Sequence, residues 1–133
     1  MRKNKIPLDK VQAAFNAAIK RRDGRCMVQD YEPCCGALEC SHFYTVGGSP
    51  SLRFYPPNAY AQCQKHHWNH HNKKDLFYMK WLANEHWPDF QNMLGFKNCY
   101  IRYTDELKAQ IIRLCNEDKL EELKGLLEAE FRK

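Results

Sequence analysis

Residues 58–67 read Asn-Ala-Tyr-Ala-Gln-Cys-Gln-Lys-His-His, so Cys63 and His66 form a Cys-x-x-His pair with a second histidine directly after it. This spacing lets both side chains of the pair reach one ion where a loop enters a helix. Zinc in a structural site takes four such ligands, usually as two pairs from two short loops. The stretch therefore predicts one half of a zinc site.

The other half of this site is expected upstream, where Cys26 and Cys35 are the candidates and Cys35-Gly36 resembles the close of a zinc knuckle. The separation departs from the usual spacing of a pair, so residues 27–34 must bulge outward and Cys34 is an open alternative to Cys35. Buried free thiols are the simpler alternative for all of these cysteines. The predicted structural zinc ligands are Cys26, Cys35, Cys63 and His66.

The metal-binding residue types are clustered along the chain. Among seven cysteines and six histidines, Cys99, Cys115 and His86 alone lie outside residues 26–71. An odd number of cysteines without a secretory signal argues against a disulfide scaffold and for thiolates kept in a reducing compartment. We therefore expect a cytoplasmic protein.

Length and composition limit the chain to one ordinary globular domain. The 133 residues are 44% hydrophobic and 28% charged, which excludes disordered and low-complexity classes. No apolar run approaches the roughly 20 residues that span a bilayer. Residues 1–25 hold most of the basic excess and form a basic arm suited to nucleic acid, although a solvated helix face explains the charge equally well.

Periodicity predicts helices at both ends and a hairpin between them. Apolar residues at three- and four-residue spacing predict a helix over 8–22 that ends at Asp23-Gly24. Two strands, 40–45 and 51–55, are expected to be joined by the Gly-Gly-Ser-Pro turn at 47–50, with a helix over 59–72. The fold class is therefore α+β.

Further helices are expected in the tail, over 75–87, around 90–94, after Thr104 and after Asp118, which has capping-box spacing with Glu121. Domain organisation follows as one unit over 1–133. It comprises a basic N-terminal helix (1–25), a metal-binding core (26–75) and a helical tail (76–133).

The order His42, Asn58, His67 around the predicted hairpin and helix resembles the HNH, or ββα-metal, nuclease motif. That resemblance implies a zinc-stabilised ββα-metal fold, similar to a treble clef, in which His42 is the general base and Asn58 orients the hairpin loop. It also implies that His67 ligates a catalytic Mg²⁺ or Mn²⁺. Ser41 stands where many such enzymes have a second ligand. His71, one turn after His67, is a candidate for that place, or else a solvent-exposed helix histidine.

More narrowly, Arg25-Cys26, Glu39-Cys-Ser-His-Phe-Tyr44, Leu52-Arg-Phe54 and the stretch from Asn58 to Cys63 are similar to the phage recombination protein family called NinG or Rap. The chain departs from the family in having Cys-x-x-His-His where the family has Cys-x-x-Cys-Asn. The resemblance implies a structure-selective endonuclease acting on branched DNA, such as D-loops or Holliday junctions, in a bacterial or phage-infected cell. A nuclease that resolves a symmetric junction needs two active sites, so we expect a homodimer, with the leucine-rich tail either as its interface or folded onto its own core.

Four basic residues are candidate DNA contacts: Arg53, Lys65, Arg21 and Arg22. Lys73 and Lys74 border the predicted helix and are weaker candidates, since surface lysines usually need no explanation. We expect the aromatic side chains to pack the core, with stacking on nucleic-acid bases as the alternative; they are Trp68, Trp81, Trp87, Phe77 and Tyr78.

Two other functions fit the same residues. A sequence-preferring HNH nicking or restriction-type enzyme would cut linear duplex, whereas a recombination nuclease would prefer branch points. A zinc-knuckle module that binds nucleic acid or protein without cutting it would have no use for a base at His42.

Overall fold

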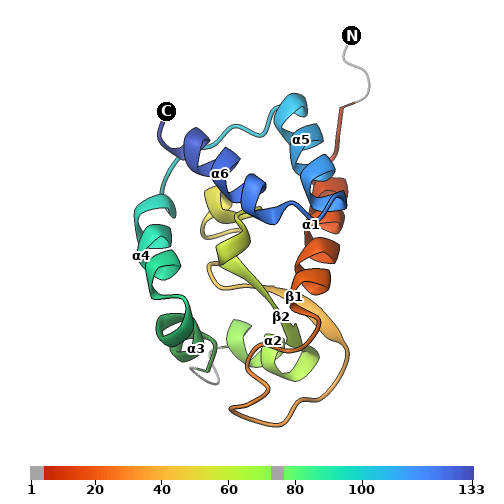
Figure 1. The fold of residues 1–133 in the computed structure, drawn as a ribbon, viewed down its shortest axis with the longest axis vertical. Helices are drawn as coiled ribbons and strands as arrows, with labels where there is room; N and C mark the ends of the chain where they lie inside the picture. The colour runs from red at the N-terminus through yellow and green to blue at the C-terminus, as the bar shows by residue number, and fades with distance from the viewer. Residues whose placement is uncertain (1–4, 73–76) are drawn as a thin grey trace.

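The computed structural model describes residues 5–72 and 77–133, and within these residues it has six helices around one antiparallel hairpin, which confirms the α+β class. Figure 1 shows α1 and α5 side by side on one flank, α3 and α4 on the other, and α2 at one end of the hairpin. No helix in the described part of the chain is long and apolar enough to cross a membrane. The elements are α1 (Leu8–Asp23), β1 (Leu38–His42), the 3₁₀ turns η1 (Pro50–Leu52) and η2 (Pro56–Asn58), β2 (Ala59–Cys63), α2 (Gln64–His71), α3 (Phe77–Glu85), α4 (Trp87–Phe96), α5 (Asp105–Asn116) and α6 (Leu120–Phe131).

The hairpin pairs β1 with β2 in a register that places His42 opposite Ala59 and Leu38 opposite Cys63. The predicted strand over 51–55 is wrong, because that segment begins in the 3₁₀ turn η1 and continues as a turn up to Pro56, where η2 starts. Proline fixes φ and lacks a backbone donor, so a segment bounded by two prolines pairs poorly. The second strand is the beginning of the predicted helix 59–72, which therefore starts only at Gln64.

The predicted N-terminal helix is confirmed as α1. Its buried stripe is Val11, Phe15, Ala18 and Ile19, and it contacts α5 and both strands. Gly24 ends it in the left-handed conformation (φ 70°) and donates its N–H to the Lys20 carbonyl.

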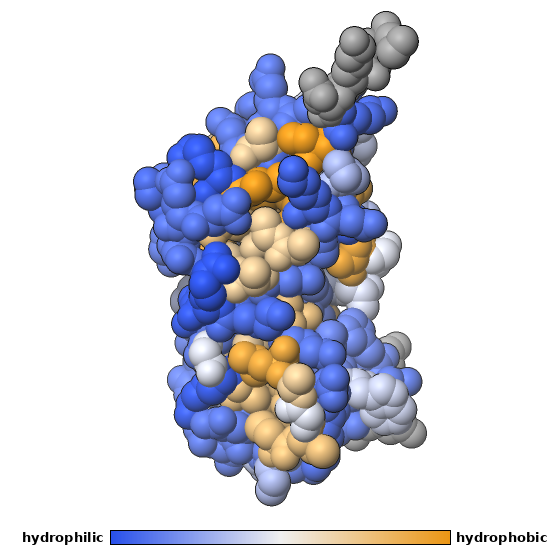
Figure 2. Space-filling model, turned by 90° about the vertical axis from the view of Figure 1, so that its right-hand side faces the viewer, coloured by the Kyte–Doolittle hydropathy of each residue, from blue (hydrophilic) through white to orange (hydrophobic). Residues whose placement is uncertain are grey.

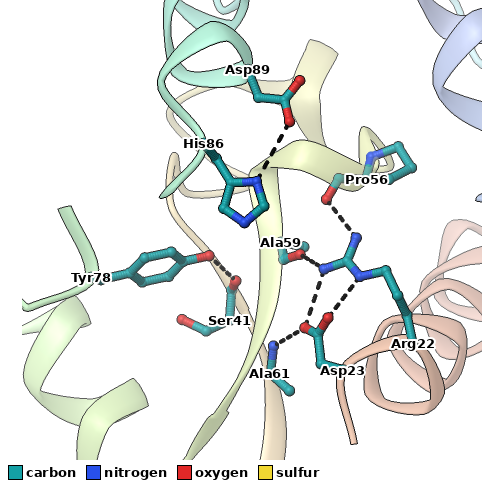
Figure 3. Close-up of polar contacts among 9 residues, drawn as sticks. All are labelled: Arg22, Asp23, Ser41, Pro56, Ala59, Ala61, Tyr78, His86 and Asp89. Carbon is teal, nitrogen blue, oxygen red and sulfur yellow. Dashed lines mark hydrogen bonds and ion pairs between the residues drawn. The ribbon is translucent and has the colours of Figure 1, made fainter. Parts of the chain in front are cut away.

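The end of α1 is fastened to the hairpin by an ion pair (Figure 3). The Arg22 guanidinium donates to the carbonyls of Pro56 (3.2 Å) and Ala59 (2.7 Å), and its Nε lies 2.7 Å from Asp23. The Asp23 carboxylate, 4% exposed, also accepts the N–H of Ala61 at 2.8 Å. These bonds give Arg22, a predicted DNA contact, a structural role at the junction of α1 and the hairpin.

The tail follows the predicted order with two corrections. Thr104 caps α5 by accepting the Leu107 N–H, as predicted. The capping box at Asp118 is wrong: α6 begins at Leu120 without a side-chain cap, and Asp118 adopts φ 56° and pairs with Arg21. The helix expected around 90–94 is longer and begins at Trp87.

The leucine stripe of the tail is buried within the chain. Its core members are Leu107, Ile111, Leu114, Leu123 and Leu127. The stripe therefore folds onto its own core, which was one of the two predicted outcomes, and a homodimer would have to use another surface.

Candidate metal centre and active site

Four side chains from three segments meet at the end of the hairpin where β2 enters α2. These are Cys26, Cys34, Cys63 and His66, whose ligand atoms all lie within 4.8 Å of one another. The Nδ1 atom of His66 is 3.3 Å from the sulfur of Cys26, 3.2 Å from that of Cys63 and 3.9 Å from that of Cys34. Three thiols and one imidazole form a donor set that suits tetrahedral zinc, so this group can hold a zinc ion.

The fourth member of this group is Cys34, the alternative to Cys35, and the sulfur of Cys35 lies outside the group. The backbone carbonyl of Cys35 accepts the Lys65 N–H at 3.1 Å, and its backbone also hydrogen-bonds the thiol of Cys63. Partial desolvation and the neighbouring thiols of Cys26 and Cys63 raise the pKa of Cys34 to about 12. Several thiols this close together resist being ionised at the same time, because their negative charges repel. A bound cation removes this repulsion.

Gly36 allows the loop that carries Cys34 and Cys35 (the cysteine loop) to lie against the start of α2. It has φ 91°, and a Cβ atom there would lie 2.5 Å from Oε1 and 2.7 Å from Cβ of Gln64. The N–H of Gln64 donates to the Ala37 carbonyl at 2.9 Å. Only glycine satisfies both the backbone conformation and the close approach, and this contact aligns Cys34 with Cys63.

Glu32 completes the surroundings of the zinc site. Its carboxylate lies 3.2 Å from Nε2 of His66 and 3.5 Å from Nζ of Lys65. A carboxylate on one imidazole nitrogen leaves the other nitrogen free for metal, and Nδ1 is the one that faces the thiols. The sequence held no spacing signal for Glu32. Lys65, a predicted DNA contact, is ion-paired here.

Helix α2 also carries a pair of histidines, His67 and His71, that lies outside the candidate zinc site. Nε2 of His71 lies 2.8 Å from Nε2 of His67, and Nδ1 of His67 lies 2.9 Å from the carboxylate of Glu39. Burial, then the neighbouring His67 and His70, lowers the pKa of His71, which favours its neutral form. Two imidazole nitrogens that face one another, with a carboxylate behind one of the rings, are donors that could bind a divalent metal. They line an open pocket of about 350 Å³.

His42 ends β1 and is 8% exposed. Its Nε2 donates to the Arg53 carbonyl at 2.8 Å, which fixes the tautomer and leaves the lone pair on Nδ1. Burial, with a smaller contribution from the nearby imidazoles of His67 and His71, lowers the pKa of His42 to about 4. The ring is therefore neutral at cellular pH.

Asn58 holds the loop between the two strands. Its Nδ2 donates to the carbonyls of Tyr44 (3.0 Å) and Leu52 (3.2 Å), and its Oδ1 accepts the Tyr44 N–H at 2.9 Å. Its own carbonyl accepts the Phe43 N–H at 2.8 Å. The side chain is fully buried, so these bonds fix the loop that presents the Arg53 carbonyl to His42.

The other predicted DNA contacts are dispersed. Arg53 lies over the Phe54 ring and donates Nε to Gln12, while Arg21 bonds Asp118 and the Cys115 carbonyl. Lys73 and Lys74 lie outside the described residues. Hydrophilic residues cover most of the face in Figure 2, and apolar residues show in separate patches between them. Within residues 5–72 and 77–133, the structure thus brings together the candidate metal ligands, whereas the predicted basic contacts lie apart.

The expectation that the aromatic residues pack the core holds for Trp81 (7% exposed) and Tyr78 (1%). It is wrong for Trp68 and Trp87, which are 57% and 50% exposed. Trp68 lies in the wall of the pocket that contains His67 and His71.

A larger cavity of about 800 Å³ lies between α1, α4 and α6. Its lining mixes acids with bases, including the Arg22–Asp23 pair and the contact of His86 with Asp89 (Figure 3). It contains none of the candidate metal ligands.

No family model, curated protein or solved structure matches the chain. Function is therefore argued from the geometry of the site.

Proposed function

We propose that the protein is a metal-dependent DNA endonuclease of the HNH type. One observation carries the proposal: a buried, neutral histidine with a fixed tautomer ends β1 within electrostatic range of the paired imidazoles of His67 and His71. A structural histidine in a core does not need such neighbours, whereas phosphodiester hydrolysis needs a base and an electrophile together.

His42 is the base in this proposal. With Nε2–H held by the Arg53 carbonyl, its Nδ1 takes a proton from the attacking water. Because its pKa is about 4, the base is unprotonated throughout the physiological range, at the cost of lower basicity. Asn58 keeps the carbonyl of Arg53 in place by bonding both sides of the loop.

His67 and His71 would hold the catalytic divalent metal, with Glu39 orienting His67. When bound, such a metal neutralises charge that develops on the scissile phosphate and the leaving oxygen. Imidazole ligands suit Mn²⁺ better than Mg²⁺, which prefers oxygen. Of the two metals expected from the sequence, Mn²⁺ is the better match.

The candidate zinc ligands support this site structurally and do not themselves bind the substrate or the catalytic metal. Cys63 and His66 fix the start of α2, and the same helix presents His67 and His71 on its other side. Similarity to the NinG or Rap family supports branched recombination intermediates as substrates.

The proposal is tested by cleavage of a synthetic four-way junction and a matched linear duplex with Mn²⁺, Mg²⁺ or no added metal. Wild type should cut with Mn²⁺, and His42→Ala should not. His86→Ala is the matched control, because it removes a histidine outside the site and should cut normally. Equal cutting of both substrates would reject the branched-DNA preference. Binding without any cutting by wild type would reject the nuclease and leave a zinc-stabilised binding module.

A further inference from the structure

Helix α2 has an unusual stripe on its open side. Gln64, His67, Trp68 and His71 follow the i, i+3, i+4, i+7 spacing that normally marks a face buried in the core. The core-facing residue of α2 is instead His66, which is 1% exposed. The stripe lines the open pocket, with Glu39 and Asn72 beside it. The stripe therefore faces this pocket and not the core of the protein.

Trp68 is the apolar member of this stripe. Its side chain is exposed, no ring contact to it is found among the described residues, and its own carbonyl accepts the Asn72 side chain. A large apolar ring costs free energy when it is left in water, so its place beside two candidate metal ligands calls for a ligand with an aromatic face.

We infer that Trp68 is a stacking platform for an unpaired nucleobase of a DNA strand whose backbone passes the His67–His71 pair. This inference rests on the proposed endonuclease function and narrows its substrate to DNA with unpaired bases near the cut. Bases inside a duplex are already stacked on both faces, so the indole can stack only on a base that has left the helix. Stacking on aromatic side chains is tolerant of sequence, which suits an enzyme that recognises a branch.

The test measures binding of a fluorescein-labelled oligonucleotide as a single strand, as a splayed fork and as a blunt duplex, without added divalent metal so that no strand is cut. Trp68→Ala should weaken binding of the single strand and the fork by about tenfold or more and leave the duplex unchanged. Trp68→Phe should restore most of the affinity, because it keeps an aromatic face. Trp87→Ala is the matched control, since that indole is equally exposed but lies on α4, outside the pocket.

Equal affinity of wild type and Trp68→Ala for the single strand would overturn the inference, as would an equal loss for duplex and single strand. A matched RNA strand that bound more tightly than the DNA strand would overturn the choice of DNA. The two proposals fail separately. If Trp68→Ala cuts and binds DNA as wild type does, the stacking role of Trp68 is rejected and the nuclease proposal stands. If binding of the single strand needs Trp68 but wild type never cuts, the nuclease proposal is rejected and the stacking role stands.

Discussion

The Nε2 atoms of His67 and His71 lie 2.8 Å apart on successive turns of α2. The carboxylate of Glu39 lies beside Nδ1 of His67 and so orients that ring. A metal bound by the two Nε2 atoms would therefore meet ligands that are already oriented. The metal site that we propose for catalysis is therefore distinct from the candidate zinc site, which uses the neighbouring His66.

Replacing either histidine should weaken Mn²⁺ binding to the zinc-loaded protein. Loss of an outer partner of a metal ligand costs about 10–100-fold in affinity, so His67→Ala or His71→Ala should cost at least that much. Isothermal titration with Mn²⁺ measures it, and His86→Ala should bind as wild type does. Unchanged affinity in both variants would place the metal elsewhere.

Cys34 and Cys35 offer a matched pair for the zinc site. Cys34→Ser should lose most bound zinc and unfold at a lower temperature, because a structural zinc contributes folding free energy. Cys35→Ser should keep both zinc and stability. Metal content by mass spectrometry after dialysis against a weak chelator decides between them, and the reverse result would restore Cys35 as the ligand.

Gly36→Ala should lower the free energy of unfolding by about 1–3 kcal/mol, from the positive φ alone, with a further loss from the clash with Gln64. Gly125→Ala is the control, because an added Cβ meets nothing within 4 Å in α6 and the change should stabilise by about 0.5–1 kcal/mol. Urea denaturation of both variants measures the difference. Equal stability of Gly36→Ala and wild type would show that the loop does not need glycine.

Acid should destabilise wild type more than His42→Gln. The folded pKa of His42 is about 4, below its ordinary value of 6.5, so the unfolded chain binds the extra proton first. The stability that comes from keeping the ring neutral is complete above pH 6.5 and declines as the pH falls toward 4. Between pH 7 and pH 5.5 the wild type should lose about 1 kcal/mol more than the variant. Protonation of the candidate zinc ligands affects both proteins equally, so its effect on stability cancels in the comparison. Equal losses of stability in the two proteins would mean that the pKa of His42 is not lowered by folding.

The residues that were predictable from sequence are those whose role depends on short spacing. Cys63 and His66 are close in the chain and stay close at the start of a helix, and Thr104 caps α5 through a residue three positions away. The stripe of α1 follows from periodicity alone.

What could not be predicted depends on contacts between distant segments. The choice of Cys34 over Cys35 follows from the backbone bond between Cys35 and Lys65, which links the loop to α2. Glu32 and Glu39 contact their histidines from other segments of the chain, and no spacing in the sequence marks either carboxylate as a partner of a histidine. The strand over 59–63 was read as helix because it lacks Gly and Pro, and pairing with β1 overrides that local preference.

Helix α2 is only eight residues long, well below the length of about 12–15 residues at which an isolated helix becomes stable in water. Its stability therefore depends on packing against the hairpin and the loop that carries Cys34, and the two histidines and the indole lie on a helix that is not stable by itself. The same segment should open most readily in the native state, and its amide protons should exchange with solvent ahead of those in α1 and α5.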